Sequence, residues 1–178
     1  MFRPLALGAA GAIVVLSCAS AHVTLETREA PIGASYKAVM RVPHGCDGSA
    51  STAIRVRLPE GVVGVKPMPK PGWRLDTVAS KYPKPYTLRG AKVTEGVTEI
   101  SWSGGKLADA HYDEFVFMSA LAEELDAGKT IYFPVVRECE KGVHRWIDIP
   151  KEGGHGGGQG HGEGSAEPAP GLKLLPKR

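Results

Sequence analysis

Apolar and polar residues alternate with a period of two along much of the chain between residues 22 and 150. In residues 53–58, Ile54, Val56 and Leu58 alternate with two arginines, and the segment stops at a proline. Alternation of this kind, bounded by Pro and Gly, predicts β-strands with one buried face. The clear segments, followed by three weaker ones, are 36–42, 53–58, 98–103, 114–118, 130–136 and 144–149, then 23–25, 62–65 and 74–78.

The spacing of the turns predicts an all-β fold. Pro and Gly clusters separate the strands at intervals of roughly 8–15 residues, which is typical of an antiparallel β-sandwich or barrel with Greek-key connections. One helix is plausible at residues 119–125, although this segment is equally compatible with a turn between strands. Trp102 alternates with Ile100, so we expect it in the core, where large aromatic side chains contribute most.

Residues 1–21 have the pattern of a secretory signal peptide. Arg3 precedes an apolar run at 5–16, and the segment closes on Ala19-Ser20-Ala21. Cleavage after Ala21 makes His22 the first residue of an exported protein. The alternative is a lipoprotein signal, in which Cys18 is lipidated and becomes the first residue.

The other two cysteines, Cys46 and Cys139, form an even pair in an exported chain, which favours a disulfide. The formal net charge is only +3, so the composition gives no indication of a nucleic-acid partner.

The C-terminal residues 151–178 are predicted to be a disordered tail. Glycine dominates residues 153–164, which also contain His155 and His161 and have no apolar residue to bury. The folded domain is therefore expected at residues 22–150. The two tail histidines are candidates for weak metal capture, and the alternative is a linker that only keeps the protein soluble.

A histidine at a mature N-terminus has unusual chemistry. Its α-amine and its own Nδ1 can chelate one metal ion in a six-membered ring. Two nitrogens at this spacing suit Cu(II), which prefers tetragonal nitrogen and oxygen ligands. Copper(I) carriers instead use clusters of thioethers, and Met40 and Met118 lie in predicted strands as core residues. His22 therefore predicts a Cu(II) site, unless signal peptidase merely left a histidine behind.

Several blocks of the chain resemble the YcnI-like copper-binding family of exported bacterial proteins. The blocks follow one another in the family's order, and they are 21–25, 41–48, 65–73, 100–105, 112–115 and the strand around Trp146. The resemblance implies a cupredoxin- or immunoglobulin-like sandwich. It also implies a solvent-exposed Cu(II) held by a single-histidine brace, with a carboxylate ligand and a nearby Trp.

The resemblance assigns His22 to the brace and Trp146 to the residue beside the metal. The position of the carboxylate stays open, with Glu26 and Glu114 as the candidates. His44 follows a proline beside Cys46, so a disulfide there is expected to bring its imidazole close enough to supply a third nitrogen. The alternative for His44 is a loop histidine bonded to backbone.

Three functions are compatible with these features. The first is a Cu(II)-binding protein of copper homeostasis without enzymatic activity. The second is a sandwich module that docks to a membrane copper transporter or a periplasmic copper chaperone. The third is a copper monooxygenase, which needs a second brace histidine that His44 alone is positioned to supply, and a flat aromatic surface that this chain has few residues to build.

Overall fold

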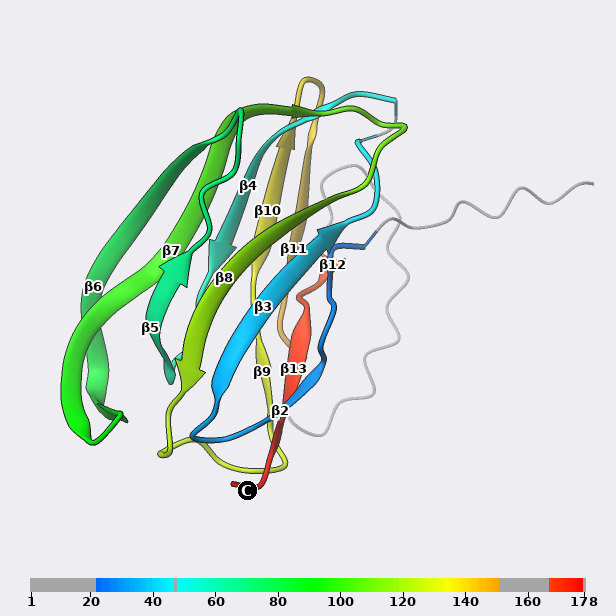
Figure 1. Cartoon of the computed structure of the whole chain (residues 1–178). Helices are drawn as coiled ribbons and strands as arrows, with labels where there is room; N and C mark the ends of the chain where they lie inside the picture. Colours follow the sequence, from blue (N-terminus) through cyan, green and yellow to red (C-terminus); the bar gives the residue numbers. More distant parts are fainter. Residues whose placement is uncertain (1–21, 47, 151–166, 178) are drawn as a thin grey trace, which may run out of the picture.

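A computed structural model of the chain describes residues 22–46, 48–150 and 167–177 (Figure 1). The predicted signal peptide and the tail segment 151–166 lie outside the described residues. Within the described ranges, no helix is long and apolar enough to cross a membrane.

β-Strands make up most of the described part of the chain. Their bounds are β1 Thr24–Leu25, β2 Glu29–Pro31, β3 Ser35–Val42, β4 Ser51–Arg57, β5 Val62–Pro67, β6 Arg74–Leu88, β7 Ala91–Leu107, β8 Asp113–Leu121, β9 Thr130–Tyr132, β10 Val135–Cys139, β11 Val143–Asp148, β12 Glu167–Pro168 and β13 Gly171–Leu175. The predicted all-β class is confirmed.

Two sheets form the layers of a β-sandwich, with β3 and β8 in front of β4, β10 and β11 (Figure 1). One sheet has the order β1-β3-β8-β5 and the other β12-β11-β10-β4-β7-β6. A third, smaller sheet has the order β2-β13-β9. Most neighbouring strands are antiparallel, but β11–β12 and β2–β13 are parallel pairs.

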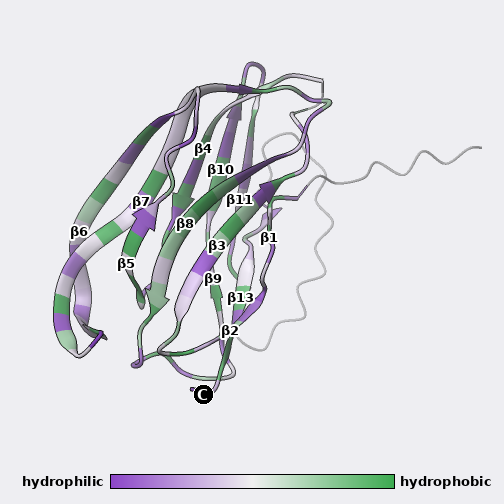
Figure 2. Cartoon of the chain, in the orientation of Figure 1, coloured by the Kyte–Doolittle hydropathy of each residue, from purple (hydrophilic) through white to green (hydrophobic). Residues whose placement is uncertain are grey.

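The core lies between the layers and is built from the inward-facing residues of each strand. Along β3, buried residues at 36, 38, 40 and 42 are interrupted by the hydrophilic Lys37 and Arg41, and the strand shows separate hydrophilic bands (Figure 2). This pattern explains why sequence periodicity predicted the strand. Trp102 is fully buried, as expected, and its indole N–H donates to the carbonyl of Met68 at 3.0 Å. Phe115 packs edge-on against the Trp102 ring, with ring centroids 5.5 Å apart.

The segment predicted as a helix or a turn at 119–125 is not helical. Strand β8 continues through Leu121, and a turn follows. Ser119 interrupts the apolar pattern of the core face, but its hydroxyl donates to the carbonyl of Tyr36 at 3.1 Å, so the buried polar group is satisfied. The predicted strand 130–136 is two strands, because Pro134 separates β9 from β10.

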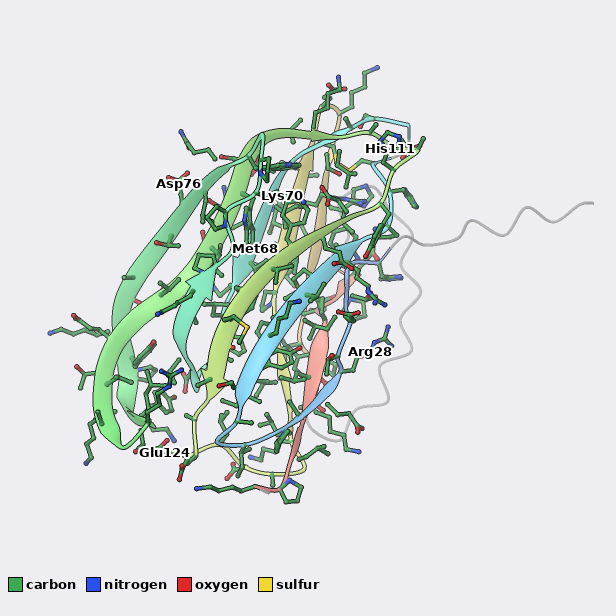
Figure 3. The ribbon with its side chains drawn as sticks, viewed as in Figure 1. Arg28, Met68, Lys70, Asp76, His111 and Glu124 are labelled. Carbon is green, nitrogen blue, oxygen red and sulfur yellow. A yellow bond between two sulfur atoms is a disulfide. The ribbon has the colours of Figure 1, made fainter. Side chains whose placement is uncertain are left out.

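Of the two methionines predicted to lie in the core, only one does. Met40 is fully buried, but Met118 is 45% exposed, on the outer face of β8. It faces away from the core because its neighbour Phe117 points inward and successive strand residues alternate. Met68 is also exposed (Figure 3).

The β6–β7 hairpin is much longer than the two short strands predicted there. Most residues of its outer half are exposed or only partly buried, so they carry no clear apolar alternation. The two-residue turn Arg89-Gly90 has positive φ at both positions, 49° and 81°, which is the requirement of a type I′ hairpin turn.

The predicted domain boundary at residue 150 is wrong, because residues 167–175 belong to the fold. Strand β13 lies between β2 and β9, and both Leu172 and Leu174 are buried. These two leucines alternate with exposed Lys173, which is the pattern of a half-buried strand. The prediction of disorder was therefore too broad at its C-terminal end.

Truncating this strand's core side chains is expected to destabilise the whole domain. Leu172→Ala leaves a cavity in the main core and is expected to lower the free energy of unfolding by about 2–5 kcal/mol. Lys173→Ala on the same strand is the control and is expected to change it by no more than about 0.5 kcal/mol. Urea unfolding measures both, and equal stabilities would mean that β13 is not part of the cooperative fold.

Candidate metal centre

His22 lies at the start of the described chain, two residues before β1 begins at Thr24. Val23 and Leu25 are both 2% exposed, so their burial fixes the strand and leaves the alternating His22 side chain at the surface. The imidazole Nε2 lies 2.8 Å from Oε2 of Glu167. The side chains of the two residues are 43% and 30% exposed, so solvent reaches this contact.

Trp146 contacts the same carboxylate oxygen. It is 1% exposed on β11, and its indole N–H donates to Oε2 of Glu167 at 3.0 Å. Glu167 reaches this position because β12 runs parallel to β11, with Trp146 and Glu167 as register partners. The backbone N–H of Ala169 donates to the carbonyl of Asp148 at 2.9 Å and extends the pairing.

Two cationic or aromatic side chains surround the Trp146 ring. His144 stacks on it with ring centroids 5.7 Å apart and an angle of 15°. The guanidinium carbon of Arg137 lies 4.9 Å from the ring centroid. The surface contact between His22 and Glu167 is therefore connected, through Trp146, to the buried Arg137.

The predicted disulfide between Cys46 and Cys139 is confirmed, with the two Cα atoms 6.2 Å apart. It joins the loop that follows β3 to the end of β10. A buried pair of backbone hydrogen bonds between Cys46 and Ser49 closes the loop further. A disulfide is consistent with a periplasmic or extracellular location.

His44, expected as a third nitrogen ligand, has its described contacts elsewhere. Its Nδ1 lies 2.8 Å from the carbonyl of Gly45 and 3.4 Å from Oδ1 of Asp109. Among the described residues, no group of three or more His, Cys, Asp or Glu side chains is placed to hold a metal ion. The structure brings His22 and Trp146 together, but it shows no contact of His44 with either within the ranges it covers.

The carboxylate at His22 is neither of the two candidates taken from the sequence. Glu26 pairs with Arg41 at 2.7 Å, and Glu114 lies 3.8 Å from the same guanidinium and also accepts from Tyr112. Glu167 was missed because it follows the glycine-rich segment. The available signal was the apolar alternation of Leu172 and Leu174, which marks a strand.

Of the other histidines, the structure describes His44, His111 and His144, and only His144 is described in contact with Trp146. His111 lies in the loop between β7 and β8, where its backbone N–H donates to Ala108 at 3.0 Å (Figure 3). His155 and His161 lie outside the described residues. His144 was missed as a neighbour of Trp146, although its position two residues earlier on one strand places both on the same face.

The fold and this centre define an immunoglobulin-like β-sandwich that carries a histidine–glutamate–tryptophan group at its surface. The chain belongs to the family described as a domain of unknown function (DUF1775), whose model matches residues 22–174. This is the family of YcnI-like copper-binding domains that the sequence blocks resembled. The match extends past residue 150 and includes Glu167.

Comparison with solved structures supports the fold. An uncharacterized protein from Nocardia farcinica, described as having an immunoglobulin-like fold, is similar with a TM-score of 0.60 and 23% identity. The similarity covers 88% of this chain and 99% of that one. A search of curated proteins finds no match.

Removing the disulfide is expected to cost a large part of the domain's stability. The two cysteines are 93 positions apart, and the chain-entropy estimate for a loop of that length is about 4–5 kcal/mol. The double variant Cys46→Ala/Cys139→Ala is therefore expected to unfold at much lower denaturant concentration. Chemical denaturation measures this, and an unchanged midpoint would show that the bridge does not constrain the unfolded chain.

Proposed function

We propose that the mature protein is an exported Cu(II)-binding protein of copper homeostasis, in which the α-amine and Nδ1 of His22 hold the metal. The observation that carries the proposal is the contact of His22 Nε2 with Glu167, shared with the Trp146 N–H. The group lies at the residue expected to become the N-terminus.

The geometry of this contact suits an amine–imidazole chelate. A carboxylate accepts hydrogen bonds, so Nε2 carries the hydrogen and the lone pair of a neutral imidazole is on Nδ1. Nδ1 is the nitrogen that closes a ring with the α-amine. Outer carboxylates orient metal-binding histidines in this way at many sites, and they raise the basicity of the ligand. Glu167 then positions the His22 ring. Because the His22 side chain is 43% exposed, the ring stays accessible to solvent and metal.

Export is part of the proposal. The α-amine exists only after cleavage at Ala21, and the disulfide suits an oxidising compartment. We place the mature protein in the periplasm or outside the cell. An intact mass beginning at His22 supports this, whereas a lipid-modified Cys18 would make the chelate impossible.

A binding role is favoured over monooxygenase chemistry by the position of His44. A second brace histidine is required for that chemistry, and the described contacts of His44 are with Gly45 and Asp109. Docking to a membrane copper transporter or a copper chaperone is compatible with metal binding, because such a partner would donate copper to the site or receive copper from it. Oxygen-dependent peroxide formation by the copper-loaded protein would favour the enzyme instead.

Blocking the α-amine is expected to abolish tight copper binding. A variant with one extra alanine before His22 retains every side chain but replaces the amine with an amide. We expect the mature protein to bind one Cu(II) with nitrogen couplings in its electron paramagnetic resonance spectrum, and the extended variant to lose this signal.

The control for this experiment is the variant His155→Ala/His161→Ala, which removes the tail histidines and is expected to keep the tight equivalent. If the extended variant binds as the mature protein does, the brace is wrong. If the tail variant alone loses binding, the copper is in the tail.

Neutralising the carboxylate is expected to weaken binding without unfolding the protein. Glu167→Gln removes the charge that orients His22, and loss of such outer partners typically costs about 10–100-fold in metal affinity. Glu123→Gln is the matched control, because Glu123 pairs with Lys177 at the surface. Competition with a chromogenic chelator measures both dissociation constants, and equal values for the two variants would exclude a role for Glu167.

A further inference from the structure

Arg137 is a charged side chain in the core of a small domain. It lies on β10, is 1% exposed and ranks among the largest fully buried side chains. Burying a guanidinium is costly unless its surroundings compensate, so its retention calls for a structural reason. Its Nη1 donates to the backbone carbonyl of His44 at 2.7 Å, and its guanidinium carbon lies 4.9 Å from the Trp146 ring centroid.

A continuous set of contacts connects Arg137 to the candidate metal centre. The guanidinium contacts the Trp146 ring, the indole N–H of Trp146 donates to Glu167, and Glu167 contacts His22. Strand register places these groups together, because Val135 pairs with Trp146 and Arg137 is the next residue on the same face of β10. Diagonal neighbours on one face are within reach of long side chains.

The other end of Arg137 is anchored by the disulfide. The carbonyl that it contacts belongs to His44, two residues before Cys46, and Cys46 is bonded to Cys139 on the strand that carries Arg137. The loop and the strand are therefore covalently joined next to the guanidinium. This leaves little freedom for Arg137 to leave the Trp146 ring.

We propose that Arg137 is a positioning residue of the copper site: its anchored guanidinium holds the Trp146 indole so that its N–H fixes Glu167 against His22. This inference rests on the proposed copper function. It also assigns a role to the loop around His44, which contributes a backbone carbonyl to the same network.

The direction in which copper affinity changes when Arg137 is replaced separates a positioning role from a purely electrostatic one. A positive charge near a bound cation opposes its binding, so removing a purely electrostatic Arg137 tightens copper binding. Removing a positioning residue weakens it. Lysine is a poor substitute, because its compact ammonium lacks the planar fork that stacks on a ring while donating sideways.

The test is a double-mutant cycle with Arg137→Lys and Trp146→Phe, measured as Cu(II) dissociation constants by chelator competition. Trp146→Phe keeps a ring but removes the N–H. We expect each single variant to weaken binding by about 10-fold. The double variant is expected to bind no more weakly than Trp146→Phe alone, because Arg137 acts through that N–H. The proposal would be overturned if the losses of affinity in the two single variants multiplied in the double variant. An unchanged affinity of Arg137→Lys would overturn it as well.

Arg137→Gln completes the set, since it removes the charge: weaker binding supports positioning and tighter binding overturns it. Near-ultraviolet circular dichroism checks the fold of each variant. Should these variants unfold, nuclear Overhauser effects between the Arg137 guanidinium and the Trp146 ring in the mature wild-type protein decide the matter. Contacts that are absent or fluctuating overturn the proposal, and contacts that persist support it.

The outcomes for the two proposals are distinguishable. If the alanine-extended protein binds copper as tightly as the mature protein, the copper site at His22 is wrong whatever Arg137 does. If binding depends on the free His22 amine but the cycle is additive, only the role of Arg137 is wrong.

Discussion

The carboxylate of Glu167 accepts from groups that belong to distant parts of the chain, and the candidate centre depends on this convergence. His22 is the first described residue, Trp146 lies on β11, and Glu167 lies on β12, after the glycine-rich stretch. Such a contact forms only when β1, β11 and β12 are all docked. Burial of Leu172 and Leu174 on β13 holds residues 167–175 in place, so one C-terminal segment contributes to both the core and the centre.

Sequence periodicity predicted the strands whose two faces differ in burial. Strands β3 and β4 have one face in the core and one toward solvent, and both were predicted within a residue or two at each end. The outer half of the β6–β7 hairpin was not predicted, because both of its faces are largely exposed and its pairing is carried by backbone hydrogen bonds. The alternation of apolar and polar residues cannot indicate a two-stranded ribbon whose two faces are equally exposed.

The centre was predictable only where one residue type carries the chemistry. His22 after a predicted cleavage site and the Cys46–Cys139 pair are visible in the sequence alone. Glu167 is one acid among many, and its role comes from a parallel pairing between β11 and β12. Arg137 was equally hidden, because an arginine in an alternating strand is normally expected to face solvent and this one faces the core.

Strand β6 ends the six-stranded sheet, and its sequence limits what can attach there. Its register with β7 is interrupted between Lys81 and Tyr86, where Pro83 and Pro85 flank Lys84. Proline has no N–H to offer a further strand, and lysines along an edge repel one another across two molecules. Edge-to-edge pairing between copies is therefore disfavoured along β6, the longest edge strand of the described sheets.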